Sequence, residues 1–175
     1  MRRLFALIVL SAACALGADA GVRPAPVFVP VEVVDVIETD EGLAVLLLER
    51  KEGLALPIMI GPNEALAISL RLQKKTPPRP LTHDLLEEVI TRLGGRLVRV
   101  EIDDLQANTF LGRVVIARGK QTVTLDARSS DAIALALGLE APIQVSRAVL
   151  DRAGLSVKDM GRKTKPSPQL TPETL

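Results

Sequence analysis

The residues best suited to chemistry gather at three places along the chain. One is residues 79–89, RPLTHDLLEEV, which contain His83, the single histidine of the sequence, between Arg79 and Asp84. At a helix start the macrodipole disfavours a charged imidazolium, and a neutral imidazole is the form that a general base needs. We therefore predict that His83 and Asp84 are catalytic residues and that Arg79 binds substrate phosphate, since arginine can hold two phosphate oxygens at once.

The other two places are junctions between a strand and a helix, residues 60–64 (IGPNE) and 126–131 (DARSSD). Carboxylates at such junctions suit a divalent cation such as Mg²⁺, which takes one or two carboxylates plus phosphate oxygens. We predict Glu64, Asp126 and Asp131 as ligands of Mg²⁺ or Mn²⁺, with Asp131 also a catalytic candidate, and Arg128 as a second phosphate ligand. The alternative is that these residues are ordinary helix caps, because Asp, Ser and Thr are common at helix starts.

The elements that must position these residues follow from hydrophobic patterning. β-Branched and alternating apolar runs bounded by turn residues predict strands. They cover residues 31–37, 43–49, 54–60, 96–102, 109–117, 120–126 and 143–145. Short turns between most of them favour antiparallel pairing, and residues 103–108 are predicted to be a turn.

Four helices are predicted. The first covers residues 63–74 and is apolar on more than one face, which predicts burial. The second begins at a cap formed by Thr82 or Asp84 and ends near residue 93, with an apolar stripe at helical spacing: Leu85, Leu86, Val89, Ile90 and Leu93. The third covers residues 131–137 with Ser130 as cap, and the fourth runs from the cap Ser146 to residue 153. The prediction is an α+β fold with mixed, mainly antiparallel strands and about four helices.

A short internal repeat links two of the helices. Residues 64–70 (EALAISL) match residues 131–137 (DAIALAL) in the order acid, Ala, apolar, Ala, apolar, small, Leu. Either the domain consists of two related β-β-α halves, or two buried helices use alanine to solve the same packing problem. If the halves are related, Glu64 and Asp131 occupy equivalent places.

The ends of the chain differ in character from its middle. Residues 1–20 join a basic start, an apolar run and an A-x-A sequence, which predicts a signal peptide and export to the periplasm or the medium. Lipidation at Cys14 is the alternative. Residues 21–30 are rich in proline and predict a linker, residues 31–155 form the domain, and residues 156–175 are predicted to be a disordered tail.

The aromatic content and the net charge of the chain bear on whether it binds nucleic acid. The chain has three Phe and no Trp or Tyr, although proteins that bind single-stranded nucleic acid usually stack bases on aromatic rings. Residues 31–155 hold 15 basic and 18 acidic side chains, a net charge of −3, whereas tight nucleic-acid binders are typically basic. Neither the net charge nor the aromatic content therefore supports nucleic acid as a partner. Open strand edges favour a homodimer.

Three stretches together carry a family resemblance. LPIMIGPNEALAISLRL, PPRPLTHDLLEEVI and LDARSSDAIALAL resemble, in order and spacing, the bifunctional nuclease domain family. The resemblance covers residues 31–154 and implies a compact α+β domain; the family is named after plant members that degrade DNA and RNA. Ser129 stands where the family often has Pro, and a signal peptide is atypical of the family.

Two functions follow as expectations. The first is a metal-assisted nuclease that hydrolyses phosphodiester bonds of DNA or RNA, to which the resemblance and the clustered Asp, Glu, Arg and His point. The alternative is an exported, non-catalytic binding or assembly module that keeps the fold. The sequence holds no H-E-x-x-H or G-x-S-x-G motif, no phosphate-binding glycine loop and no Cys/His zinc pattern.

Overall fold

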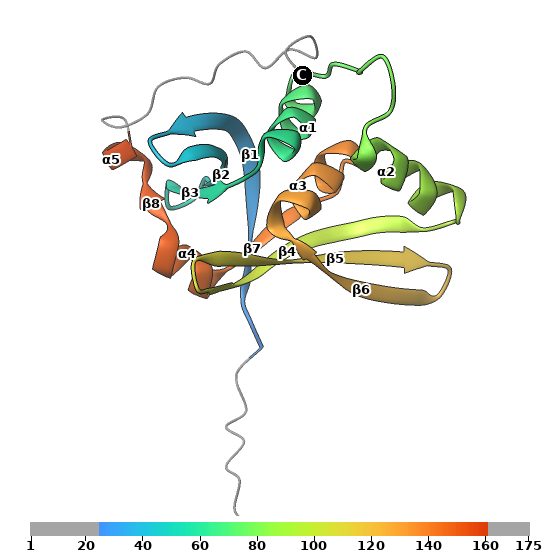
Figure 1. The fold of residues 1–175 in the computed structure, drawn as a ribbon. Coiled ribbons are helices and arrows are strands. Elements are labelled where there is room, and N and C mark those ends of the chain that lie inside the picture. The colour runs from blue at the N-terminus through green and yellow to red at the C-terminus, as the bar shows by residue number, and fades with distance from the viewer. Residues whose placement is uncertain (1–24, 161–175) are drawn as a thin grey trace, which may run out of the picture.

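The computed structural model describes residues 25–160, and one eight-stranded sheet forms its frame (Figure 1). The strands lie in the order β6-β5-β4-β7-β1-β2-β3-β8, and every neighbouring pair is antiparallel except β4 with β7. The strands are β1 (Phe28–Thr39), β2 (Gly42–Glu49), β3 (Leu54–Met59), β4 (Arg96–Gln106), β5 (Thr109–Arg118), β6 (Gln121–Arg128), β7 (Ile143–Ser146) and β8 (Leu155–Ser156). The helices are α1 (Pro62–Leu72), α2 (Thr82–Arg92), α3 (Ser129–Gly138), α4 (Arg147–Ala153) and the single turn α5 (Val157–Met160). The predicted α+β fold with mainly antiparallel strands is confirmed.

The first meander, β1 to β3, begins earlier than expected. Residues 28–31 pair with β7, so the predicted proline-rich linker ends in a strand. Proline has no backbone N–H, so a strand tolerates Pro30 at a position where no hydrogen bond to the neighbouring strand requires that N–H. Alternate residues of the meander, such as Val36, Val45 and Leu47, are at most 1% exposed and point into the core.

The second meander, β4 to β6, contains the largest error of the sequence prediction. Residues 103–106 belong to β4 rather than to a turn, because the β4–β5 hairpin pairs as far as Gln106 with Thr109. The turn consists of Ala107 and Asn108 alone, both with positive φ (45° and 62°). Two positive φ values are typical of the tight hairpin turn whose twist matches that of the strands. Asn adopts this conformation readily but Ala rarely does, so only one of the two turn residues is of the type that marks such a turn.

Helices α1 and α3 each follow a three-strand meander and pack against one another. The predicted burial of α1 is confirmed, since residues 65–70 are all buried. In both helices alanines face the interior with at most 1% exposure: Ala65, Ala67, Ala132, Ala134 and Ala136. The chain therefore repeats a β-β-β-α unit, and β1 and β4 run antiparallel on either side of β7. This arrangement agrees with two related halves, each one strand longer than the predicted β-β-α unit.

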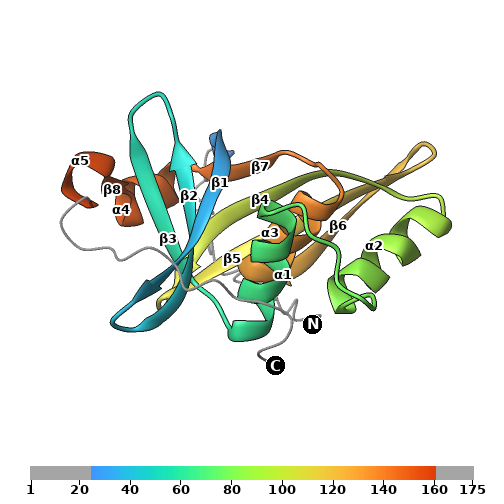
Figure 2. The ribbon, with the colours of Figure 1, turned by 90° about the horizontal axis from the view of Figure 1, so that it is seen from above.

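Helix α2 forms where it is predicted, but most of its apolar stripe is exposed. Its N-cap position is Leu81, whose backbone N–H donates to Oδ2 of Asp84 at 2.7 Å, so Asp84 caps the helix from within its first turn. Of the predicted apolar stripe only Ile90 is buried. The other four side chains are exposed: Leu85, Leu86, Val89 and Leu93. Figure 2 shows the reason, because α2 lies at the end of the molecule away from β1–β3, where few other elements surround it.

The C-terminal elements complete the domain. The predicted cap Ser146 is confirmed, since its Oγ accepts a hydrogen bond from the N–H of Val149 at 3.3 Å. Part of the predicted tail is ordered, because Ser156 pairs with Leu54 and residues 157–160 form α5. Within residues 25–160, no helix is long and apolar enough to cross a membrane. The predicted signal peptide, Cys14 and tail residues 161–175 lie outside the described residues.

Gly112 of β5 sets how closely the start of α3 approaches the sheet. A Cβ at Gly112 would lie 3.0 Å from both the carbonyl oxygen of Ala127 and Cα of Ser129. We expect Gly112→Ala to lower the free energy of unfolding by about 1–3 kcal/mol, because backbone rather than a flexible side chain must move. Urea unfolding followed by circular dichroism measures this in a chain without Trp or Tyr. Thr122→Ala, at an exposed position of β6, is the control and should change stability by less than about 0.5 kcal/mol; equal effects would contradict the steric account.

Candidate functional site

Three helix starts meet in one charged network. Glu64 and Asp131 are each the third residue of their helices, α1 and α3, and so occupy equivalent positions in the two halves. His83 is the second residue of α2. Arg128, the N-cap residue of α3, binds both Glu64 and Asp131, and Asp131 in turn contacts His83. The N-terminus of a helix carries a partial positive charge, so their convergence favours negative groups at this place.

Arg128 joins the two carboxylates. Its Nη2 donates to Oε1 of Glu64 at 2.5 Å and to Oδ1 of Asp131 at 2.9 Å, and its Nε donates to Oδ2 of Asp131 at 2.6 Å. The hydrogen bonds with Asp131 and then with Glu64 raise the pKa of Arg128 further above its ordinary value. The side chain of Arg128 is 67% exposed, whereas that of Glu64 is 12% exposed. Arg128 is therefore the outer member of the network and the one that a ligand can reach.

His83 extends the network on the inner side. Its Nε2 lies 3.0 Å from Oδ1 of Asp131, and the imidazole is 12% exposed. Burial raises the pKa of Asp131, but hydrogen bonds from Arg128 and His83 outweigh it and hold the pKa below its ordinary value of 3.8. An ionised carboxylate only accepts hydrogen bonds, so Nε2 must carry the proton. In neutral His83 the lone pair is then on Nδ1, the form that can take a proton.

A second arginine fixes the position of α2. Arg71, near the end of α1, has a side chain only 10% exposed and donates to Oδ1 of Asp84 at 2.8 Å and to Oε1 of Glu87 at 2.5 Å. The carboxylate of Glu87 occupies the space that a Cβ at Gly138 of α3 would need. Asp84, predicted to be catalytic, thus binds Arg71 and the helix cap. Sequence reasoning missed Arg71 and Glu87; the signal was a lone basic residue at the end of the buried, apolar part of α1.

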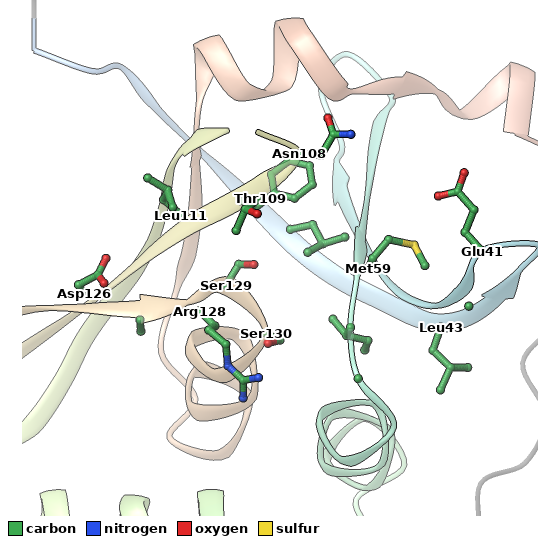
Figure 3. A pocket seen from close by; sticks show the side chains of 16 residues that line it. Glu41, Leu43, Met59, Asn108, Thr109, Leu111, Asp126, Arg128, Ser129 and Ser130 are labelled. Atoms are coloured by element: carbon green, nitrogen blue, oxygen red, sulfur yellow. The ribbon is translucent and has the colours of Figure 1, made fainter. Parts of the chain in front are cut away.

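Besides Asp84, two predicted residues lie outside the network. Asp126 is exposed on β6, and Figure 3 shows it pointing away from Arg128. Arg79 is exposed in the loop between α1 and α2. Neither forms an ion pair with another described residue.

The predicted metal ligands do not form a metal site in this arrangement. Among residues 25–160, no group of three or more His, Cys, Asp or Glu side chains is placed to hold a metal ion. Glu64 and Asp131 do converge, but the guanidinium of Arg128 lies between them and satisfies both charges. A cation would have to displace it, so we assign no chemical step to a metal.

A pocket of about 550 Å³ opens beside the network, between the two meanders (Figure 3). Apolar residues such as Leu43, Met59 and Phe110 line one part of it. The start of α3 supplies the polar part with Ser129 and Ser130, which are 6% and 7% exposed. Neither hydroxyl forms a hydrogen bond with another described residue, and α3 has no side-chain cap. The predicted cap role of Ser130 is therefore wrong, and both hydroxyls are available to a ligand.

The depressed pKa of Asp131 makes stability depend on pH. Asp131 in the folded state holds its proton less tightly than in the unfolded state, so its contribution is complete above pH 4 and declines as pH falls below 3.8. We expect Asp131→Asn to be less stable than the parent by about 1 kcal/mol at pH 7, and the difference to shrink below pH 4. Urea unfolding at pH 7, 5 and 3 measures it. Asp151→Asn, at an exposed position of α4, should show no such trend. A gap for Asp131→Asn that stays constant down to pH 3 would contradict the network.

Comparison with known proteins identifies the family of the chain. Residues 45–158 match the bifunctional nuclease domain. An uncharacterised protein of Mycobacterium tuberculosis is 44% identical over 124 residues, 70% of this chain and 74% of that protein. Bifunctional nuclease 1 of Arabidopsis thaliana is 30% identical over 129 residues, 71% of this chain but 39% of the plant protein. Bifunctional nuclease 1 of Oryza sativa subsp. japonica is 29% identical over 116 residues, 65% of this chain and 35% of the rice protein. With the family domain matched over most of the described fold, this chain belongs to the bifunctional nuclease domain family.

Proposed function

We propose that this protein is a nuclease that hydrolyses phosphodiester bonds in DNA or RNA. The observation that carries the proposal is the chain of hydrogen bonds from His83 through Asp131 and Arg128 to Glu64, built on three converging helix starts. The names of the plant relatives support the same activity, although this chain spans 39% or less of their length.

In this proposal each charged residue has a different role in hydrolysis. His83 exchanges a proton at Nδ1 with the attacking water or the leaving oxygen, and Asp131 holds the imidazole in the required tautomer. Arg128 releases one carboxylate and binds the phosphate in its place. Its side chain is 67% exposed, so the phosphate can reach the guanidinium without entering the protein interior. Asp84, held by Arg71, positions α2 and hence His83 rather than touching the substrate.

The pocket and a basic loop provide room for the rest of the nucleotide chain. Arg128 lies in both the network and the pocket wall, so a nucleotide with its phosphate on Arg128 places its base or sugar among Ser129, Ser130 and Phe110. Lys74, Lys75 and Arg79, in the loop before α2, are exposed and form no ion pair with another described residue. They are free to neutralise neighbouring phosphates.

A nuclease assay tests the proposal directly. The full-length chain is incubated with plasmid DNA, a single-stranded oligonucleotide and RNA, in Mg²⁺, in Mn²⁺ and in EDTA. We expect His83→Ala and Asp131→Asn to lower the rate by about 10²–10⁴-fold, since each removes the proton-transfer pair. Asp151→Asn is the matched control and should keep the parent rate. Hydrolysis that persists in both site variants would overturn the site assignment, and the EDTA arm tests the predicted metal requirement separately.

Nucleic-acid binding gives a second test that does not need turnover. We expect Lys74→Ala with Lys75→Ala to weaken binding of a fluorescent oligonucleotide and to lower the slope of log affinity against log salt by about one per lost phosphate contact. Lys120→Ala, on the exposed turn after β5, serves as control. An unchanged slope in the double variant would exclude the loop from the interface.

The alternative is a binding or assembly module without catalysis. It is favoured by the full neutralisation of Arg128 within the network and by the exposed apolar side chains of α2. Absence of hydrolysis in Mg²⁺, in Mn²⁺ and in EDTA, with the fold intact by circular dichroism, would select this alternative.

A further inference from the structure

Helix α2 exposes an apolar seam that the rest of the described chain does not cover. Leu85, Val89 and Leu93 follow one another at intervals of four residues and are 57%, 42% and 63% exposed, and Leu86 beside them is 43% exposed. Side chains four apart lie on one face of a helix, so the exposed groups form a continuous stripe. Contiguous apolar stripes of this kind on soluble proteins mark interaction sites.

The seam is complementary to itself. If a second α2 packs antiparallel around a two-fold axis through Val89, Leu85 faces the partner's Leu93, and Leu93 faces the partner's Leu85. Val89 meets its own copy on the axis. Such isologous contacts, in which one patch serves both subunits, are those that close a dimer.

Charge along the seam favours the same arrangement. Glu88 and Arg92 form an ion pair at 2.6 Å on one flank of the stripe. In an antiparallel helix pair this flank lies beside the same flank of the partner, so Glu88 comes next to the partner's Arg92. Opposite charges beside an apolar seam set the partner and the orientation of paired helices. In a parallel pair related by a two-fold axis, this flank would instead lie beside the opposite flank of the partner, which carries Leu86, and the two ion pairs would not meet.

A neighbouring strand extends the apolar surface. Val123 and Leu125 of β6 are 50% and 47% exposed. They pair with Ile116 and Val114, and side chains of directly paired residues share one face of a sheet. Ile116 lies against Gly95 and Ile90 at the end of α2. Val123 and Leu125 therefore point to the same side of the sheet as α2 and add apolar area there.

We propose that the occupant of this seam is a second copy of the chain, held by antiparallel pairing of α2 with α2. Because the paired helices run in opposite directions, the two candidate sites, each at the start of one α2, lie at opposite ends of the helix pair. The proposal does not depend on nuclease activity, and its tests measure mass and association alone.

Size-exclusion chromatography with light scattering on the full-length chain tests the dimer. We expect twice the single-chain mass at about 100 µM, and the single-chain mass for Val89→Arg, which brings two guanidinium groups together on the axis. Val34→Arg, at a β1 position 48% exposed, is the matched control and should remain dimeric. A parent protein that is monomeric at 100 µM overturns the proposal. Dissociation by Leu125→Arg but not by Val89→Arg overturns it in favour of β6.

Charge exchange tests the antiparallel arrangement. Glu88→Arg alone and Arg92→Glu alone should each weaken association about tenfold or more, measured by sedimentation at several concentrations. The double variant, Glu88→Arg with Arg92→Glu, restores opposite charges across the axis and should recover the parent affinity. Circular dichroism confirms that each variant is folded. A double variant that remains as weak as the single ones rules out this pairing.

Discussion

The close packing of α1 against α3 is the constraint on which the candidate site depends. Alanines with at most 1% exposure, among them Ala67 and Ala134, face the interior from both helices, and small side chains let two helix backbones come near one another. Both helices begin at the end of a three-strand meander, so their first turns arrive at the same place. This is why Glu64 and Asp131, 67 residues apart in sequence, share one guanidinium.

Two arginines connect the helices by ion pairs, one at the surface and one in the interior. Arg128 is largely exposed and joins α1 to α3 at their starts, whereas Arg71 is nearly buried and joins the end of α1 to α2. A buried ion pair is costly to break from one side, because the remaining charge is left without a partner. Arg71 is thus suited to hold the imidazole of His83 at a fixed distance from Asp131, and Arg128 is suited to exchange partners.

Sequence reasoning reached most of the fold because its elements obey local rules. The strands and the helices α1, α3 and α4 follow from hydrophobic spacing and turn residues, and the family resemblance is confirmed. The site was reached less completely. His83, Asp131, Arg128 and Glu64 do converge, but Asp126 and Arg79 lie apart and Asp84 faces Arg71. Spacing along a chain does not say which side chains meet across helices, and the stripe on α2 shows its limit: periodicity identifies an apolar face but not what covers it.

The two halves of the domain are alike in plan yet differ at one corresponding position. The residue before the first turn of the helix is Gly61 in the first half and Arg128 in the second. A Cβ at Gly61 would lie 2.5 Å from Oε2 of Glu64, so a side chain in the first half would displace the carboxylate that Arg128 of the second half binds. The glycine in the first half and the arginine in the second give the two carboxylates one shared cation, so two similar halves form an asymmetric site.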